Sequence, residues 1–555
     1  MKKSKFSFLL VLAVVLAVFL SACSSGTNTK NNATNGGTKK APEQILNVLE
    51  TAEIPSMDSV MSQDVLSFTT LNNVNEGLYR LDPNQKVIPG VADGMPQANA
   101  DKTVYTIKLK KDVKWSNGDP VTAKDFVYAW QRAIDPKTAS PYGPYMMSGK
   151  IKNATEIAAG KMPVTDLGIK AVDDYTVEIT LVKPLPYFEN LMTFQLFYPQ
   201  NQKFVESKGK DYAKNAANLV YNGPFKLTKW DGPQATEWTY EKNDSYWNAK
   251  EVSLKKINFN VAKDSQAAAN AFEAGEADIT GKLAQAAVIT QYQDSKELLR
   301  YLEPSIWWIK MNEQNPVLKN PNIRRAIALS VDKKALTNDV LANGSIPADF
   351  IVPKEFAFLN GKDFRTKDNN FLKTNKDEAK KLWETGLQDL GKKDVTFTYV
   401  GQDTTTSKTT DAFIKDQLEK NLPGLKINIE SVPFKIRLDR EDKQQYDLLM
   451  GGWGPDYMDP MTYMDLWVTN GGQNKMSYSD PAFDKYIEQA NNELAAKPEE
   501  RWKALQDAEK LLLDGDAAVA PLYQRTVNIL IKSKVSGFAH HPIGGEYSYQ
   551  WIKIK

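Results

Sequence analysis

Acidic residues are the side chains with catalytic potential that this sequence offers in greatest number, 68 in all. Asp456 and Asp459 lie three residues apart within GGWGPDYMDP (451–460), and two carboxyl groups can act as acid and base in glycoside hydrolysis. Acids this common also pair by chance on surfaces, although an aromatic content of 10% leaves sugar binding open. The two histidines, His540 and His541, are expected to form an exposed loop pair without a metal. Neither group predicts a catalytic centre.

Other chemistry is excluded by motif and composition. The sequence contains no GxxxxGK[ST] phosphate loop, no HExxH and no GxSxG. One cysteine rules out a disulfide framework and any multi-cysteine metal site. The charge balance of 70 − 68 = +2 is too small for a protein whose main partner is nucleic acid. We therefore expect a binding protein that is not an enzyme and needs no cofactor or metal.

Residues 1–22 have the pattern of a secretory leader. Three lysines among the first five residues precede a mostly apolar stretch over 6–20, which is short for a bilayer-spanning helix. Leu20-Ser21-Ala22 then precedes Cys23, and this junction resembles the lipobox of bacterial lipoproteins. The resemblance implies that Cys23 is diacylated and anchors the protein, because two acyl chains give stable anchoring. The alternative is a secreted protein in which Cys23 is a leftover thiol.

Residues 23–44 are polar and have little to bury, so we expect a flexible tether between the membrane and the folded part of the chain. Asn-Ala-Thr at Asn32 and Asn153 matches the glycosylation pattern, but in a protein with a bacterial leader the match is irrelevant. No later stretch of 18 apolar residues occurs, so no further membrane span is expected.

Alternating and helical patterns are mixed along the chain after residue 45. Residues 104–109 and 175–181 alternate apolar and polar side chains, which predicts half-buried strands. Between Thr122 and Ile134 the apolar residues share one face at helical spacing, and Thr122 can cap that helix. The mixture predicts an α/β or α+β protein. Further helices are expected at 264–274, 322–341, 377–389, 409–420 and 497–513.

Seven segments, in order along residues 45–555, resemble the oligopeptide-binding lipoproteins of bacterial ABC importers. Any one of these segments would be weak evidence, but seven in sequence are strong. They are NEGLYRLD (75–82), the run from Tyr105 to Tyr142, NGPF (222–225), EKNDSYWN (241–248), AGEADI (274–279), NIRRAIALSVDK (322–333) and GGWGPDYMDP (451–460).

The resemblance implies an α/β, two-lobed, periplasmic-binding-protein-like fold of the large, three-domain class. Domain I would be discontinuous, over 45–75, 202–304 and 525–555. Domain II would be 76–201 and domain III 305–524. The crossovers near residues 304 and 524 would form a hinge between the lobes.

The resemblance also assigns a peptide anchor. Asp456 would pair with the N-terminal ammonium, which every linear peptide carries, so one carboxylate sets the register without reading side chains. Gly452 and Gly454 would lie in an extended segment that hydrogen-bonds the ligand backbone, where glycine allows close approach. The matching segment of the other lobe is Gln63 to Val65, so the peptide would form a strand held between both lobes.

Aromatic side chains are expected around the same ligand. By resemblance, Trp453 and Phe434 line side-chain pockets and Tyr142 bonds the ligand backbone, although large aromatics are often plain core. Trp307 and Trp308 are adjacent, and neighbouring residues of a strand face opposite ways, so at most one should reach the cleft.

Three positions depart from the enteric members of the family. Met450 stands where those members carry an arginine that helps neutralise the carboxylate of short peptides, and Gln63 replaces a glutamate. Thr404 to Thr410 lacks a histidine that those members use near the ligand's C-terminus. The changes suggest a different or broader range of ligand lengths.

The resemblance implies a monomeric receptor, lipid-anchored on the extracellular face of a Gram-positive cell membrane. It would capture oligopeptides and pass them to an ABC permease with separate ATPase subunits. Two alternatives stay open. One is a binder of another solute on the same fold, such as a dipeptide, signalling peptide, metal chelate, opine or sugar. The other is an extracellular hydrolase, which the lack of a nucleophile–base pair disfavours.

Overall fold

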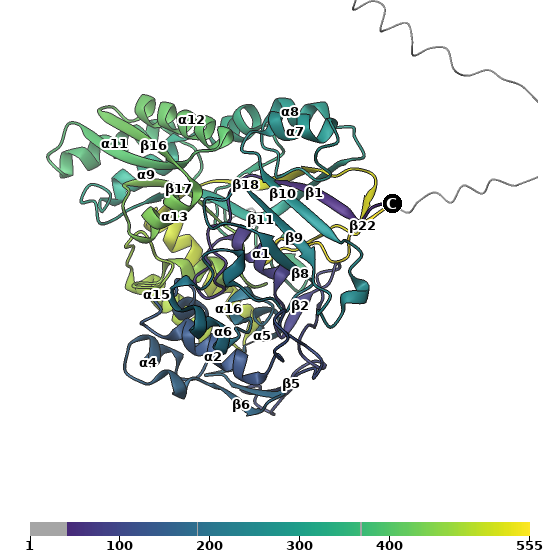
Figure 1. Cartoon of the computed structure of the whole chain (residues 1–555). Coiled ribbons are helices and arrows are strands. Elements are labelled where there is room, and N and C mark those ends of the chain that lie inside the picture. Colours follow the sequence, from purple (N-terminus) through teal and green to yellow (C-terminus); the bar gives the residue numbers. More distant parts are fainter. Residues whose placement is uncertain (1–41, 186, 367–368) are drawn as a thin grey trace, which may run out of the picture. The chain divides into compact units, whose positions relative to one another are not determined.

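The computed structural model describes residues 42–185, 187–366 and 369–555, and residues 43–555 form one folded unit (Figure 1). The expected leader at 1–22, Cys23 and most of the expected tether at 23–44 lie outside the described residues. Two four-stranded sheets and one six-stranded sheet are surrounded by helices. The mixture of helices and strands confirms the α/β prediction.

The first sheet joins the beginning of the described chain to its middle. Its order is β1 (Ile45–Glu50), β10 (Lys256–Val261), β9 (Glu237–Lys242) and β8 (Phe225–Lys229), with β1 parallel to β10 and the other pairs antiparallel. Trp238 and Phe259 on neighbouring strands are buried and stack with ring centroids 5.4 Å apart. Burying a side chain as large as Phe contributes roughly 1.5–3 kcal/mol. The sheet is therefore held by its own aromatic core.

The second sheet is built from residues 97–180 and lies at the foot of Figure 1. Its antiparallel strands are ordered β4 (Gln97–Ala98), β5 (Val104–Lys108), β7 (Thr176–Thr180) and β6 (Ile169–Asp173), which confirms the strands predicted near 104 and 175.

Helix α2 (Ala123–Ile134) confirms the helix predicted between Thr122 and Ile134. It packs against this second sheet. The Thr122 backbone N–H donates to Asp125 Oδ2 at 2.7 Å and forms half of a capping box. Such caps contribute about 1 kcal/mol, which fixes where the helix begins. The face that carries Phe126 and Trp130 is buried, as its apolar spacing indicates.

The six-stranded sheet takes its strands from the second half of the chain. Helices α9 (Pro321–Ser330), α11 (Lys376–Asp389) and α12 (Thr405–Asn421) are the main helices of this part, and α9 packs against α11. The strand order is β12 (Ile346–Pro347), β18 (Val519–Leu530), β11 (Leu298–Met311), β17 (Leu448–Trp453), β15 (Val395–Gln402) and β16 (Leu425–Val432).

Strands β11 and β18 are the longest described, with 14 and 12 residues, and they pair antiparallel. Their register shifts between Leu302 and Ile306, where Pro304 has no N–H to give to the ladder. On its other edge β11 pairs with β17, and Trp307 lies opposite Gly452. Strand β11 thus connects the irregular point at Pro304 with the end of β17, where Ile306 lies opposite Trp453.

The helix predicted over 322–341 is divided. α9 ends at Ser330, Val331 is extended, and the Asp332 side chain accepts from the Ala335 N–H to start a second turn. A π-helical turn over Leu336–Leu341 follows. The aspartate that caps the new turn is the reason for the break. The other predicted helices appear as α7 (Ser265–Glu273), α11, α12 and α16 (Pro498–Lys510).

The beginning and the end of the folded unit are bonded to each other. The Gln44 side chain donates to the Ile554 carbonyl at 2.8 Å and accepts from the Ile554 N–H at 3.1 Å. Ile554 belongs to β22 (Lys553–Ile554), which pairs with β19 (Val535–Ser536). Within the described residues, no helix has the length and apolar character needed to cross a membrane.

Candidate functional site

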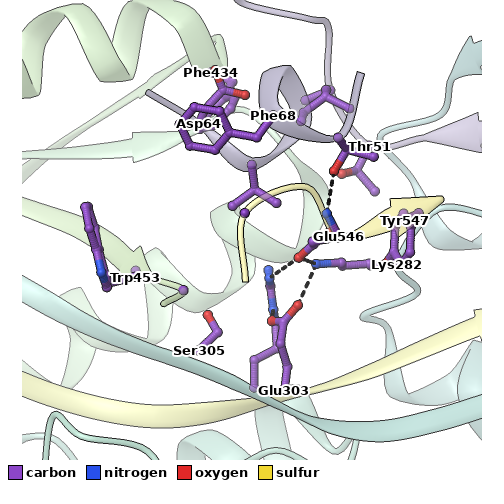
Figure 2. A pocket seen from close by; sticks show the side chains of 18 of the residues that line it. Thr51, Asp64, Phe68, Lys282, Glu303, Ser305, Phe434, Trp453, Glu546 and Tyr547 are labelled. Carbon is purple, nitrogen blue, oxygen red and sulfur yellow. Dashed lines mark hydrogen bonds and ion pairs between the residues drawn. The ribbon is translucent and has the colours of Figure 1, made fainter. Parts of the chain in front are cut away.

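A cavity of about 270 Å³, here called the cleft cavity, is lined by segments from distant parts of the chain (Figure 2). Its volume is near the lower end of the range for small-ligand sites. Helix α1 (Val65–Val74), β11, the end of β17 and the C-terminal residues near Glu546 all contribute to its walls. The structure brings together every non-lipid site residue predicted from sequence: Gln63, Val65, Tyr142, Phe434, Gly452, Trp453, Gly454 and Asp456.

Asp456 lies just after β17 and is 4% exposed. Its backbone N–H donates to Thr462 Oγ1 at 3.0 Å, which fixes the turn. Its Oδ2 atom has no hydrogen-bond partner among the described residues. Burial, together with the nearby Asp465, raises the pKa of Asp456 well above the ordinary value. The Asp456 carboxyl group thus lines the cavity with one oxygen to which no described residue donates a hydrogen bond.

The two predicted glycines have different surroundings. A Cβ at Gly452 would lie 2.8 Å from the Trp307 ring, so glycine is needed there for packing against β11. A Cβ at Gly454 would meet no described atom within 4 Å, so this position faces open space. The missing side chain of Gly452 therefore makes room for Trp307, a reason for glycine that is independent of a ligand, and the prediction that Gly452 and Gly454 hydrogen-bond a ligand backbone stays a prediction.

Trp453 is held between tyrosines. Its ring stacks on Tyr142 with centroids 6.2 Å apart and meets Tyr145 edge-on at 6.1 Å. Trp307 lines the cavity, whereas Trp308 is buried and packs against Trp467. The two adjacent tryptophans thus face opposite ways, as strand alternation predicts.

The segment Gln63 to Val65 is extended only in part. Asp64 has extended dihedral angles, but its side chain accepts from the Ser67 N–H and caps α1, so Val65 is already helical. Gln63, Asp64 and Val65 all line the cavity, and the cap starts the helix at Val65. The Gln63 side chain donates to Asp442 Oδ2 at 2.5 Å and so joins this segment to α13.

Helix α13 (Phe434–Asp442) forms another wall of the cavity. Phe434, Arg437, Leu438 and Glu441 follow the i, i+3, i+4, i+7 spacing of one helical face, and all four line the cavity. The Arg437 guanidinium lies over the Phe434 ring at 5.4 Å. Phe434 therefore presents an aromatic surface beside a charged one.

A cluster of four charges, here called the hinge cluster, lies on the cavity wall that Figure 2 shows: Lys282, Glu303, Arg525 and Glu546. Lys282 Nζ is 2.8 Å from Glu303 Oε1, and Arg525 Nε is 2.6 Å from Glu303 Oε2. Lys282 also pairs with Glu546. Burial opposes ionisation of Glu303, but Arg525 and Lys282 together hold its pKa well below the ordinary value.

A smaller cavity of about 150 Å³ adjoins the first and shares Trp307 and Gln402 with it. Met450 and several residues of the hydroxyl-rich run Thr404 to Thr410 line it. Two of the three departures named from the sequence, Met450 and the run 404–410, thus line this second cavity, whereas Gln63 lines the cleft cavity.

The expectation of an exposed histidine pair is corrected, and Asp459 has a partner beyond its own turn. His541 is buried, with Nε2 2.8 Å from Ser548 Oγ, and burial lowers its pKa to about 4; the pair is therefore not exposed. Asp459 does bond within its turn, but it also forms a two-point ion pair with Arg501 at 2.8 Å for both contacts. Local sequence gives no sign of either partner, because both partnerships depend on tertiary packing.

Two candidate functional residues, Lys150 and Asp465, are not predicted from the sequence. Lys150 is buried and Asp465 is partly buried, with 12% of its side chain exposed; both interact with Asp456, and they form an ion pair with each other at 3.5 Å. They lie 315 positions apart, and no motif marks either residue. No group of three or more His, Cys, Asp or Glu residues in the described part of the chain could hold a metal ion.

Together, the mixed α/β fold and a cleft lined from distant segments define a solute-binding protein of the two-lobed type. A family model of the bacterial extracellular solute-binding proteins, family 5, matches residues 86–475. This chain belongs to that family.

Individual relatives agree with this assignment. A dipeptide-binding protein of Lactococcus lactis is 30% identical over 94% of this chain and 96% of its own length. An oligopeptide ABC transporter substrate-binding domain of Bacillus anthracis is 44% identical, with a TM-score of 0.90 over 93% of this chain and 99% of its own. OppA of Listeria monocytogenes bound to peptide is 43% identical, with a TM-score of 0.88 over 92% and 99%.

One relative also informs on the arrangement of the parts. A structure of the Escherichia coli murein tripeptide binding protein MppA has a TM-score of 0.83 to this chain, whereas its unliganded open form has 0.61. Both are 27% identical to this chain and cover 93% of it, so the difference comes from conformation. The present structure is therefore less like that open form than like the other MppA structure.

Proposed function

We propose that this protein is a receptor that binds oligopeptides in the cleft cavity and delivers them to an ABC permease, without chemistry of its own. Family membership, the peptide-binding relatives and the peptide-bound Listeria structure support the proposal. The observation that carries it is the buried Asp456 carboxyl group with one oxygen lacking a described partner. A peptide's terminal ammonium supplies the missing countercharge and hydrogen-bond donors.

The ligand's main chain would lie along the end of β17. Gly454 leaves open space beside this edge, and Gln63 and Asp64 approach from the α1 side of the cavity. Backbone recognition between two walls gives affinity that does not depend on side-chain identity. Trp453, Tyr142 and Phe434 would offer flat surfaces to the variable side chains.

Closure would occur by a hinge in β11 and β18. The irregular register near Pro304, next to the hinge cluster, supports a bend at the crossovers near residues 304 and 524. The domain division would then be 45–75, 202–304 and 525–555 for domain I, 76–201 for domain II and 305–524 for domain III. Closure around the ligand would present the docking form to the permease, whose ATPase subunits supply the energy.

The receptor would be a monomer anchored on the outer face of a Gram-positive cell membrane through diacylated Cys23, after removal of residues 1–22. Cys23→Ser should leave an uncleaved or released protein with unchanged peptide affinity, because the lipid is remote from the cleft cavity. Fractionation of cells and labelling with a fatty acid check this. Retention of an acylated mutant in the membrane would show that the lipobox assignment is wrong.

Mass spectrometry of ligands carried through native purification tests the main proposal. We expect a mixture of short linear peptides, and calorimetry should show binding of free-amine peptides well above that of their N-acetylated forms. Recovery of a sugar or a metal chelate instead, with no peptide binding, would replace oligopeptide capture with another solute on the same fold.

A further inference from the structure

Asp456 shares its buried surroundings with a second carboxyl group. Asp465 follows α14 (Met461–Met464), and its Oδ2 atom accepts from the Tyr457 hydroxyl at 2.7 Å. Its Oδ1 atom, like Asp456 Oδ2, has no hydrogen-bond partner among the described residues. After burial, Asp465 is the largest influence that raises the pKa of Asp456, so the two carboxyl groups interact. Two neighbouring buried carboxylates repel each other unless a cation lies between or beside them.

Lys150 supplies such a cation from a different part of the fold. It is 8% exposed, its Nζ lies 3.5 Å from Asp465 Oδ2, and it donates to the Tyr145 carbonyl at 3.2 Å. Lys150 follows α3 (Gly143–Met147), in the stretch 97–180 that builds the second sheet, whereas Asp465 lies beyond β17 of the six-stranded sheet. The ion pair therefore forms only when these two parts meet.

A second contact crosses the same interface. Tyr187 stacks on Tyr457 with ring centroids 4.4 Å apart, and the Tyr457 hydroxyl is the donor to Asp465. Closure therefore brings in Lys150 and the stacked ring together, and it removes water from both carboxyl groups. Charges inside such an interface interact more strongly than they do in water.

The charges around the anchor do not cancel. Two further cations lie nearby. Arg501 is already paired with Asp459 through two hydrogen bonds, and Lys183 donates to the Asn492 side chain at 2.7 Å. Within the described residues this leaves Asp456 and Asp465 facing the single ammonium of Lys150. With both carboxyl groups ionised, the closed interface has one negative charge more than it has positive.

We propose that Lys150 is a positioning residue that sets the charge selectivity of the cleft: by neutralising Asp465 on closure, it leaves Asp456 as a single net negative charge that matches one ligand ammonium. The inference rests on the proposed peptide-binding function and names the ligand class more closely, as peptides with one cationic group at the anchored end. Without Lys150 the interface would hold two uncompensated charges, and without Asp465 it would be neutral before ligand arrives.

Removal of Lys150 and removal of Asp465 should change ligand binding in different ways. Lys150→Met should weaken binding of tetra-alanine about a hundredfold, the loss expected when one partner of a buried pair is removed, while free-amine peptide stays strongly preferred over N-acetylated. Asp465→Asn should instead reduce that preference, because Lys150 then faces Asp456 and competes with the ligand ammonium. The double variant restores a net charge of one and should recover both affinity, to within about tenfold, and preference.

The experiment is calorimetry of tetra-alanine and N-acetyl-tetra-alanine with the full folded chain and five variants. Lys150→Arg should retain affinity and preference, and Lys183→Met serves as the control for deleting a nearby lysine that has no carboxylate partner. Thermal unfolding without peptide checks that each variant folds. Equal affinities of Lys150→Met and the double variant, or an unchanged preference in Asp465→Asn, would overturn the role of Lys150. Failure of the unmodified chain to bind either peptide, or any mixed tetrapeptide pool, would instead contradict the peptide-binding proposal itself.

Discussion

The cleft cavity contains two groups of buried charges that differ in whether the protein completes them. In the hinge cluster, Glu303 is paired with Lys282 at 2.8 Å and with Arg525 at 2.6 Å, and its pKa lies below the ordinary value. At the anchor, Asp456 has an oxygen with no described partner, and its pKa lies above the ordinary value. The opposite pKa directions of these two groups reflect the cations that pair with Glu303 and the lack of such pairing at Asp456.

The largest expected effect on peptide binding comes from removing the Asp456 carboxylate, whose Oδ2 atom has no described hydrogen-bond partner. Asp456→Asn should weaken binding of a free-amine peptide by two to three orders of magnitude, because breaking a buried ion pair costs about 3–5 kcal/mol. N-acetylation of the peptide should cause a similar loss, and the two losses should not add, since they delete one interaction. Calorimetry on this two-by-two set measures it.

Asp459→Asn is the matched control, since it is the same substitution three residues away. It removes the partner of Arg501 and should therefore lower the free energy of unfolding while peptide affinity stays nearly normal. Asp456→Asn should do the opposite to unliganded stability, because a buried carboxyl group with a raised pKa is destabilising at neutral pH. Near-normal affinity of Asp456→Asn would move the anchor elsewhere.

Removing a charge from the hinge cluster, whose charges pair with one another, should change the free energy of unfolding more than the affinity for peptide. Glu303→Gln leaves Lys282 and Arg525 with Glu546 alone and should lower the free energy of unfolding by about 3 kcal/mol at neutral pH. The lowered pKa means that Glu303 stabilises the fold above its ordinary value of 4.5 and that this contribution is lost as the pH falls below it.

Urea unfolding at several pH values checks this prediction, with exposed Glu276→Gln as the control. The difference between the unmodified chain and Glu303→Gln should shrink toward acid pH. A constant difference, or a loss of preference for free-amine peptides, would contradict a purely structural role of the cluster.

The anchor should also show in the pH dependence of binding. Asp456 must be ionised to hold an ammonium, and because its pKa is raised, affinity for a free-amine peptide should fall at a higher pH than for an ordinary aspartate. Affinity should fall again above about pH 8, where an α-amino group loses its proton. The acidic limb should be absent for Asp456→Asn and for N-acetylated peptide. An acidic limb that persists in Asp456→Asn must come from another group.

The smallest expected signal is optical. Trp453 stacks on Tyr142 in this structure, so peptide-driven closure should change its fluorescence. Trp453→Phe should abolish most of the change among the 12 tryptophans, and solution scattering should still show a more compact protein with peptide. Scattering curves that do not differ at saturating peptide would count against hinge closure.

Local sequence predicts the parts of this molecule that local chemistry decides. The spacing between Thr122 and Ile134 gives α2, because an N-cap and an apolar face suffice for a helix. The alternation at Trp307 and Trp308 predicts which ring reaches the cavity. By contrast, the break after Ser330 was missed, since Asp332 reads equally well as an exposed helical residue until its cap is seen.

The candidate site was predictable where a motif marks it and not where packing assembles it. The motif GGWGPDYMDP (451–460) identifies Asp456 as a candidate site residue. No motif near Lys150 or Asp465 predicts that these two residues form an ion pair. Gly452 shows the same limit: its sequence context suggests ligand approach, while the structure shows that Trp307 occupies the space. Partners separated by hundreds of residues come from topology, which local patterns do not encode.

The contact between Gln44 and Ile554 has a consequence for how the chain is made. Strand β1 pairs with β10, which lies about 200 residues later, and Gln44 bonds to Ile554, which lies 510 positions later. Contacts of such sequence separation form slowly, because long loops must close before any contact stabilises them. The four strands of the sheet that contains β1 are all present once residue 261 has been made, whereas the bonds between Gln44 and Ile554 need almost 300 residues more. The bonds that join the two ends of the folded unit are therefore among the last that can form, and they hold together segments that the rest of the sheet does not connect.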